Sequence, residues 1–170
     1  MTTDPEAKIT TLDALAAECE AWRRAGRTLV LANGAFDMLH VGHVRYLAAA
    51  KALGDVLIVA VNSDRSVQAS KGPLRPIVPE AERIELLSHL WMVDRIVAFG
   101  SPTVGPVLER LKPEVHAKGT DYTVETVPER EIVAAYGGRT AICGDPKEHA
   151  STNVIATILE RFAPEGSGGR

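Results

Sequence analysis

Short apolar runs alternate with longer amphipathic stretches along the whole chain. Five of the runs are rich in β-branched residues and nearly continuous: Thr28–Ala32, Val56–Asn62, Arg95–Phe99, Glu114–Lys118 and Arg139–Cys143. Continuous apolar runs of this length are typical of strands that are buried on both faces of a parallel sheet. The pattern therefore predicts five parallel strands.

The stretches between these runs have the spacing and the end signals of helices. Six helices are expected: Thr11–Ala25, Val41–Leu53, Pro79–Met92, Val104–Leu111, Pro128–Tyr136 and Ser151–Phe162. Gly26, Gly54 and Gly137 follow three of them, where a helix commonly ends. The alternation predicts an α/β fold: a doubly wound, Rossmann-like sheet of five parallel strands, with helices on both faces and right-handed crossovers.

One stretch, Ser66–Val78, does not follow the alternation. It contains a glycine, two prolines and the cations Lys71 and Arg75, and it therefore predicts a mobile basic loop. In doubly wound sheets, ligands bind beyond the carboxyl ends of the strands, at the point where the strand order reverses. The segments that follow the predicted strands are therefore the places to look for chemistry.

Composition limits the classes of protein and of partner. A chain of 170 residues with 45% hydrophobic and 24% charged residues is ordinary for one globular domain, which we expect over residues 8–162, with flexible termini at 1–7 and 163–170. The net charge of −3 argues against general, charge-driven binding to nucleic acid or to an anionic membrane. An anionic ligand must then be held by a local site.

The location is expected to be cytoplasmic, with no membrane association. The first residues, MTTDPEAK, lack a secretory signal, and the longest apolar run, Val56–Val61, is far shorter than the roughly 20 residues of a membrane helix. Cys19 and Cys143 lie far apart and have no metal-ligand spacing. Two buried, reduced cysteines are the expected outcome.

The first predicted strand leads into the sequence NGAFDMLHVGH, residues 33–43, which then enters a helix. His40 and His43 are three residues apart and so lie on the same side of that helix, while Gly34 and Gly42 let a bulky ligand approach the backbone. The free amides and positive dipole of a helix start favour phosphate. A role of the histidines as a helix cap or as core residues is the alternative.

Two other phosphate-binding motifs are missing from this segment. Neither GxxxxGK(S/T) nor GxGxxG is present after the strand, so a Walker-type or dinucleotide site is not supported.

These residues also resemble a known family. NGAFDMLHVGH is similar to the HxGH signature of nucleotidyltransferases of the cytidylyltransferase superfamily, which follows a strand ending in a G-x-F-D turn. The similarity continues through KGPLRPI (71–77), PEAERIELL (79–87), KGTDY (118–122) and STNVI (151–155), and it covers residues 8–162. Within the superfamily, the longer motifs most resemble the bacterial heptose 1-phosphate adenylyltransferases.

The resemblance implies a reaction and its partners. A phosphomonoester oxygen attacks the α-phosphorus of a nucleoside triphosphate in line and releases pyrophosphate, which requires mainly positioning and charge neutralisation. The implied substrates are ATP and a sugar 1-phosphate, here heptose 1-phosphate, which yield an ADP-sugar. Mg²⁺ is expected as a cofactor held mainly by the nucleotide phosphates. A homodimer and a separate sugar kinase are also expected.

The resemblance further assigns roles to single residues. The catalytic group comprises His40, His43 and Lys71. The nucleotide-binding group comprises Asn33, Gly34, Ala35, Phe36, Gly42, Lys118, Gly119, Asp121, Ser151 and Thr152. The substrate-binding group comprises Asp37, Asp64, Arg75 and Arg83.

Several of these roles have structural alternatives. Asp37 has two interpretations, orienting Mg²⁺ through water or holding the turn, and Lys71 is either a phosphate ligand or a solvated surface lysine. Arg83 either neutralises phosphate or pairs with Glu80 or Glu82. Asp64 either faces the acceptor or caps a loop, and Ser151 and Thr152 either cap a helix, bind phosphate or do both.

Three further histidines stand outside these groups. His89 is expected to be structural. His149 precedes the Ser/Thr helix start and is a candidate ligand contact. His116 lies within a predicted strand, where an apolar residue is expected, and the sequence suggests no function for it.

The chain also departs from the heptose pattern. Thr120 replaces a glycine, Ala150 replaces a serine, and residues Gly144–Glu148 differ from the usual segment. The choice of base and of acceptor therefore stays open. One alternative is a cytidylyl- or adenylyltransferase acting on glycerol 3-phosphate, an amino-alcohol phosphate or FMN. Another is a nucleotide-binding module without turnover.

Overall fold

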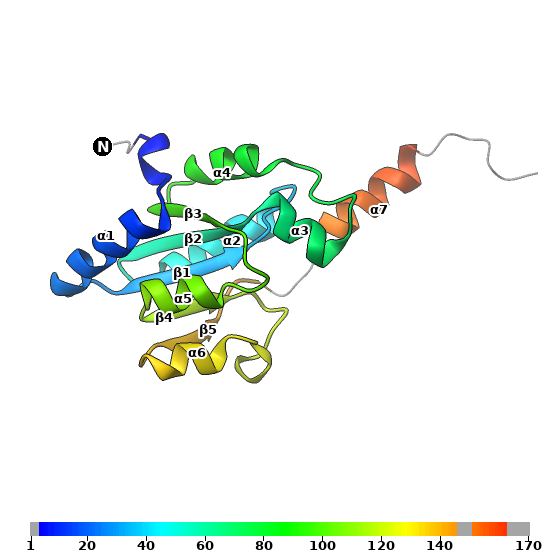
Figure 1. Cartoon of the computed structure of the whole chain (residues 1–170). Helices are drawn as coiled ribbons and strands as arrows, with labels where there is room; N and C mark the ends of the chain where they lie inside the picture. Colours follow the sequence, from blue (N-terminus) through cyan, green and yellow to red (C-terminus); the bar gives the residue numbers. More distant parts are fainter. Residues whose placement is uncertain (1–3, 146–150, 163–170) are drawn as a thin grey trace, which may run out of the picture.

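Five strands form one all-parallel sheet in the computed structural model, which describes residues 4–145 and 151–162 (Figure 1). The strands are β1 (Leu29–Gly34), β2 (Val56–Asn62), β3 (Arg95–Phe99), β4 (Val115–Lys118) and β5 (Arg139–Ile142). This confirms the predicted doubly wound sheet. The predicted bounds of β2 and β3 are correct, and the others differ by one or two residues at an end.

The order of the strands reverses beside β1. The sheet runs β3-β2-β1-β4-β5, so the chain fills one side of β1 first and then crosses to the other side. In the β1–β4 pair, Leu31 lies opposite His116 and Ala32 opposite Ala117. The carboxyl ends of β1 and β4 therefore border the crevice in which this class of sheet binds its ligands.

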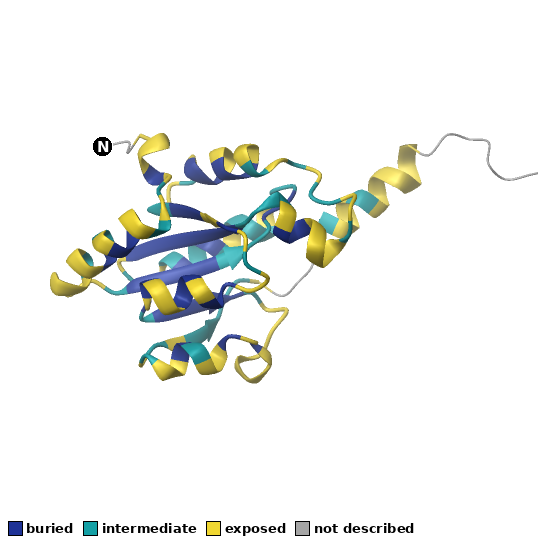
Figure 2. Cartoon of the chain, viewed as in Figure 1, coloured by how far each residue is buried: buried dark blue, intermediate teal, exposed yellow. Residues whose placement is uncertain are grey.

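Helices cover both faces of the sheet. One face packs against α1 (Leu12–Arg24), α5 (Gly105–Leu111) and α6 (Arg130–Ala135), and the other against α2 (Val41–Lys51) and α4 (Glu80–Ser88). The central strands are buried almost completely, as Figure 2 shows. The continuous apolar runs of the sequence follow from this burial on both faces.

The prediction of a mobile loop over Ser66–Val78 is wrong for its first half. Helix α3 (Asp64–Lys71) occupies that part, and the Ser63 hydroxyl caps it by accepting a hydrogen bond from Ser66 N at 3.2 Å. Gly72, with φ of 95°, ends the helix. Lys71 is therefore the last residue of a helix, and the loop is confined to the residues between α3 and α4.

The two ends of the described chain differ in their packing. A short 3₁₀ turn, η1 (Glu6–Lys8), spans the boundary between the predicted flexible start at 1–7 and the predicted domain, and its Lys8 Nζ donates to Leu90 O at 2.9 Å. A second 3₁₀ turn, η2 (Val124–Thr126), follows β4. Helix α7 (Ser151–Phe162) extends away from the sheet and has no buried residue (Figures 1 and 2). The predicted tail at 163–170 lies outside the described residues.

Candidate active site

A cavity of about 430 Å³ lies at the carboxyl end of the sheet, at the crevice beside β1 and β4. It is also bordered by the start of α2, the end of α3 and the start of α7. The residues predicted from sequence that line it are Asn33, Gly34, Ala35, Phe36, Asp37, His40, Gly42, His43, Lys71, Arg75, Lys118, Gly119, Asp121, Ser151 and Thr152. The structure thus brings residues from four separate segments, 33–43, 71–75, 118–121 and 151–152, into one cavity.

Other lining residues were not predicted as ligand contacts. They are Tyr46, Asn62, Thr120, Tyr122, Cys143, Gly144 and Asp145. Tyr46 donates to Ala117 O at 2.8 Å and so joins α2 to β4 across the cavity. The sequence contains no signal for such a contact, because it depends on which strands are neighbours in space.

The two histidines form a stacked pair at the start of α2. His40 is the N-cap residue, with φ of −138°, and its ring lies 3.9 Å from that of His43, centroid to centroid. The backbone N–H of His40 donates to His43 Nδ1 at 3.4 Å. In neutral His43 the proton therefore sits on Nε2, where it is a donor for a ligand in the cavity.

His43 is neutral at physiological pH. Burial, and to a lesser extent the neighbouring His40 and Lys71, lower the pKa of its imidazole to about 4, against an opposing effect of Asp37. A neutral imidazole needs less solvation than a cation when the cavity closes around a ligand. His43 is thus suited to donate a hydrogen bond to an anionic oxygen without first having to be protonated.

Acid should destabilise the protein through its buried histidines. Burial lowers the pKa of His43 to about 4 and, with a smaller effect of Lys118, that of His116 to about 3. Below pH ~6.5 the unfolded chain binds protons that the folded chain does not, so stability is lost as the pH falls toward the folded pKa values. Each histidine should contribute about 1.4 kcal/mol per pH unit. Urea unfolding at pH 7, 6 and 5 measures this.

The variant His116→Leu provides the matched comparison. It should reduce the change in unfolding free energy per pH unit by the contribution of one histidine. Constant stability between pH 6.5 and pH 5 would contradict the expectation. Ordinary carboxylates titrate below this pH range, so a loss of stability within it is due to the histidines.

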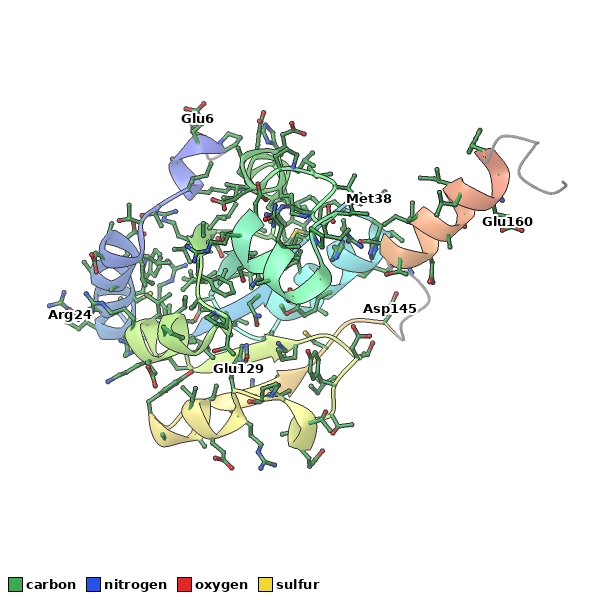
Figure 3. All side chains as sticks on the ribbon, turned by 45° about the vertical axis from the view of Figure 1, so that its right-hand side comes forward. Glu6, Arg24, Met38, Glu129, Asp145 and Glu160 are labelled. Atoms are coloured by element: carbon green, nitrogen blue, oxygen red, sulfur yellow. The ribbon has the colours of Figure 1, made fainter. Side chains whose placement is uncertain are left out.

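The turn between β1 and α2 has an unusual backbone. Phe36 and Met38 have φ of 50° and 54°, a left-handed conformation that side chains with a Cβ seldom adopt. A Cβ on Gly34 would lie 3.3 Å from the Phe36 ring, so the glycine allows this ring to fold back over the strand end. Figure 3 labels Met38 beside the start of α7.

Asp37 holds this turn in place from inside. Its carboxylate is almost fully buried and accepts hydrogen bonds from Ile77 N, from Val78 N at 2.9 Å and from Arg75 Nε at 2.7 Å. The Ser151 hydroxyl donates to Asp37 O at 2.5 Å. Asp37 thereby joins the turn, the loop after α3 and the start of α7.

These contacts favour the structural interpretation of Asp37 over a metal-orienting one. Burial opposes ionisation, but the hydrogen bonds from Val78, Ile77 and Arg75 together hold the pKa of the carboxyl below its usual value. Both oxygens are occupied by donors from the protein. Within residues 4–145 and 151–162, no group of three or more His, Cys, Asp or Glu residues is arranged to hold a metal ion.

Lys118 supplies a buried positive charge at the end of β4. Its Nζ lies 3.9 Å from Glu129 Oε2, 4.6 Å from the Tyr122 ring centre and 3.5 Å from Asn33 Oδ1. Burial lowers the pKa of the ammonium group and Glu129 raises it. Glu129, which is labelled in Figure 3, is the N-cap residue of α6. The sequence contains no signal for this partner, because the two residues belong to different elements.

The segments that form this cavity lie within a part of the chain that matches a known protein family. The family model described as cytidylyltransferase-like matches residues 31–162. The chain belongs to the cytidylyltransferase-like family. Family membership and the relatives below identify it as a protein of the nucleotidyltransferase type.

Curated relatives are longer than this cytidylyltransferase-like chain. It is 44% identical over 162 residues to the bifunctional protein HldE of Geobacter metallireducens, a match over 95% of the chain and 33% of the relative. It is 46% identical over 155 residues to that of Geotalea uraniireducens, over 91% of the chain and 32% of the relative. The chain therefore spans about a third of the length of these relatives.

A crystal structure of the lipopolysaccharide core biosynthesis protein from Thermoplasma volcanium has the same architecture. The two chains superpose with a TM-score of 0.57 at 33% identity, over 69% of this chain and 94% of the other. This supports the assignment of the fold.

Two residues predicted to bind substrate lie away from the cavity of this cytidylyltransferase-like chain. Arg83 is fully buried and donates to Val78 O at 3.0 Å, to Ala35 O and to Asp64 Oδ1 at 2.8 Å. Of the two alternatives for Arg83, the pairing with Glu80 or Glu82 is wrong, because the guanidinium points into the protein and pairs with Asp64 on α3 instead. Arg83 therefore supports the turn and the loop from behind.

We expect Asp64→Asn to leave the KM for the acceptor within about twofold. The amide keeps an oxygen for Arg83 but removes the charge opposite this fully buried guanidinium. Because the Asp64 side chain is itself 41% exposed, the loss of unfolding free energy should be about 1.5–3 kcal/mol, the range for a hydrogen bond to a charged group. Steady-state kinetics and urea unfolding measure the two effects. A tenfold rise in this KM would instead place Asp64 at the acceptor.

Two positions at which this chain departs from the heptose pattern contact each other at the rim of the cavity. The Thr120 hydroxyl donates to Asp145 O at 2.7 Å, and Arg45 pairs with the Asp145 carboxylate at 2.9 Å. The segments after β4 and β5 are thus joined through Thr120 and Asp145. His149 and Ala150 lie outside the described residues.

Proposed function

We propose that this chain transfers AMP from ATP to a sugar 1-phosphate, with heptose 1-phosphate as the acceptor, and releases pyrophosphate. The observation that carries the proposal is the convergence of His40, His43, Lys71, Arg75 and Ser151 on one cavity. Membership of the cytidylyltransferase-like family supports the type of reaction. The HldE relatives support the sugar phosphate as the acceptor.

The charges of the cavity suit a triphosphate. The N-termini of α2 and α7 both border it, and free backbone amides at a helix start favour anions. Lys71, Arg75 and Lys118 add positive charge from three other segments. A protein with a net charge of −3 is therefore equipped for polyphosphate at this one place.

The reaction needs no covalent enzyme intermediate. An oxygen of the acceptor phosphate forms a bond to the α-phosphorus as the bond to the pyrophosphate oxygen breaks, on the opposite side. His43 Nε2–H donates to an oxygen of the α-phosphate, whose charge develops in the transition state. Lys71 and Arg75 neutralise the departing pyrophosphate, and Asp37 orients Arg75. Mg²⁺ would be held mainly by the phosphates of the substrate ATP, where it would offset their negative charge.

The remaining partners follow from the same proposal. The acceptor of the proposed reaction is itself a phosphorylated sugar, so we propose that a separate sugar kinase supplies the 1-phosphate. We further propose a homodimer in the cytoplasm. Within the described part of the chain, none of the helices is long and apolar enough to cross a bilayer.

A panel assay of pyrophosphate release tests the function. ATP, CTP, GTP and UTP are each combined with heptose 1-phosphate, glycerol 3-phosphate, an amino-alcohol phosphate and FMN. We expect the highest kcat/KM for ATP with heptose 1-phosphate. A higher kcat/KM for another pair of nucleotide and acceptor would change the proposed substrates but keep the proposed nucleotidyl transfer. Tight ATP binding without any pyrophosphate release would favour a module without turnover.

A further inference from the structure

His116 lies fully buried below the floor of the cavity, in the middle of β4. Its Nε2 is 2.9 Å from Oδ1 of Asn33, the residue that begins the turn out of β1. Leu31 lies opposite His116 in the β1–β4 pair, and Asn33 is two residues further along β1, so the histidine and the asparagine share one face of the sheet. Asn33 lines the cavity, whereas His116 does not.

The surroundings of Asn33 fix which way its amide points. Lys118 Nζ lies 3.5 Å from the same Oδ1, and an ammonium group can only donate. The oxygen therefore faces His116 and Lys118. The amide nitrogen, with its two N–H donors, is directed away from them.

The same geometry fixes the tautomer of His116. Because Oδ1 only accepts, His116 donates through Nε2 and carries a lone pair on Nδ1. Nδ1 is buried and has no hydrogen-bond partner in the described part of the chain. The opposite tautomer would bury an unpaired N–H and place two lone pairs against each other, at a higher cost. Burial, and to a lesser extent Lys118, lowers the pKa of His116 to about 3, so the ring remains a neutral donor.

We propose that His116 is a positioning residue that holds the Asn33 amide with its Nδ2 donors toward the bound nucleotide, where they hydrogen-bond a nucleotide oxygen. The identity of the nucleotide rests on the function proposed above, but its binding is measurable without turnover. Without His116, the amide can rotate and present Oδ1 to the ligand. Two acceptors would then face each other, and the interaction would become repulsive.

Calorimetric titration with Mg²⁺–ATP tests the proposal. We expect His116→Leu to raise the Kd about tenfold, the usual cost of losing one hydrogen bond at a buried polar site. His116→Gln should restore binding to within about threefold of the original, because its side-chain amide can also donate to Oδ1. In turnover, His116→Leu should raise the KM for ATP and change kcat by less than threefold.

A double-mutant cycle separates positioning from packing. Asn33→Ala should weaken ATP binding about as much as His116→Leu, and adding His116→Leu to Asn33→Ala should cause no further loss. His89→Gln, a histidine change at the C-cap of α4 and away from the cavity, is the control and should leave the Kd unchanged. Thermal unfolding establishes that each variant is folded.

Three results would overturn the proposal: an unchanged Kd in folded His116→Leu, equal losses in the Leu and Gln variants, or full loss on adding His116→Leu to Asn33→Ala. If the Leu variant does not fold, Asn33→Ala decides alone, and unchanged ATP binding there overturns it. ATP binding that follows the expected pattern without turnover of any acceptor would refute the proposed function and keep this inference. Turnover of an acceptor without the expected pattern of ATP binding among the variants would support the proposed function and refute this inference.

Discussion

Replacing His43 with alanine should lower kcat/KM by about 10²- to 10³-fold, the range seen when one preorganised donor to a developing oxyanion is removed. The expectation rests on the neutral ring, on the hydrogen bond that assigns its proton to Nε2 and on its place in the cavity. Since the donated bond strengthens as charge develops on the phosphate, kcat should fall more than the affinity for ATP. Pyrophosphate release and calorimetric ATP binding measure the two quantities.

Two matched variants define the cause. His43→Gln keeps an N–H donor and should retain more activity than His43→Ala. His89→Ala removes an imidazole from the C-cap of α4, outside the cavity, and should leave kcat/KM unchanged. Retention of activity within about threefold by folded His43→Ala would remove His43 from the reaction.

Replacing Asp37 with asparagine should lower the free energy of unfolding by about 3 kcal/mol, since breaking a buried ion pair by removing one charge typically costs about 3–5 kcal/mol. The Asp37 side chain is 1% exposed and that of Arg75 15%. An amide nitrogen would also face the N–H groups of Ile77 or Val78. Activity should fall strongly as well, because the turn and the loop lose their common anchor. Urea unfolding and pyrophosphate release measure these effects.

Asp13→Asn is the matched control. Asp13 pairs with Arg110 at 3.4 Å, but its side chain is 91% exposed, so its replacement should change stability by less than about 0.5 kcal/mol. If Asp37→Asn were equally mild, the network around Asp37 would not be what holds the turn.

The fold was largely predictable because burial determines the sequence pattern directly. Strands β2 and β3 lie in the sheet with apolar neighbours on both faces, and their predicted bounds are correct. Helix α3 was missed because its polar sequence has little apolar periodicity, and the glycine and prolines that follow it dominate the local pattern. Its start depends on the hydroxyl of one residue, Ser63.

The candidate site was predictable at residues 33–43, where the residues that contact a ligand and the glycines that let it approach the backbone stand in one segment. Contacts between residues of different segments could not be predicted. Arg83 resembles a surface cation in sequence, yet it is fully buried beneath the turn, and Glu129 reaches Lys118 from a different element. The role of His116 depends on the register between β1 and β4, and strand order cannot be deduced from the runs themselves.

The position of α7 has a consequence for when the site is complete. This helix has no buried residue, and its Ile158, Leu159 and Phe162 side chains are exposed, yet Ser151 and Thr152 at its start line the cavity. An element with so little packing opens at a lower free energy than the sheet does. A ligand that contacts its start binds the closed form alone and so adds its binding energy to the local stability of the helix. Amide hydrogen exchange across α7 should therefore slow on nucleotide binding, while exchange in β1 and β2 stays unchanged.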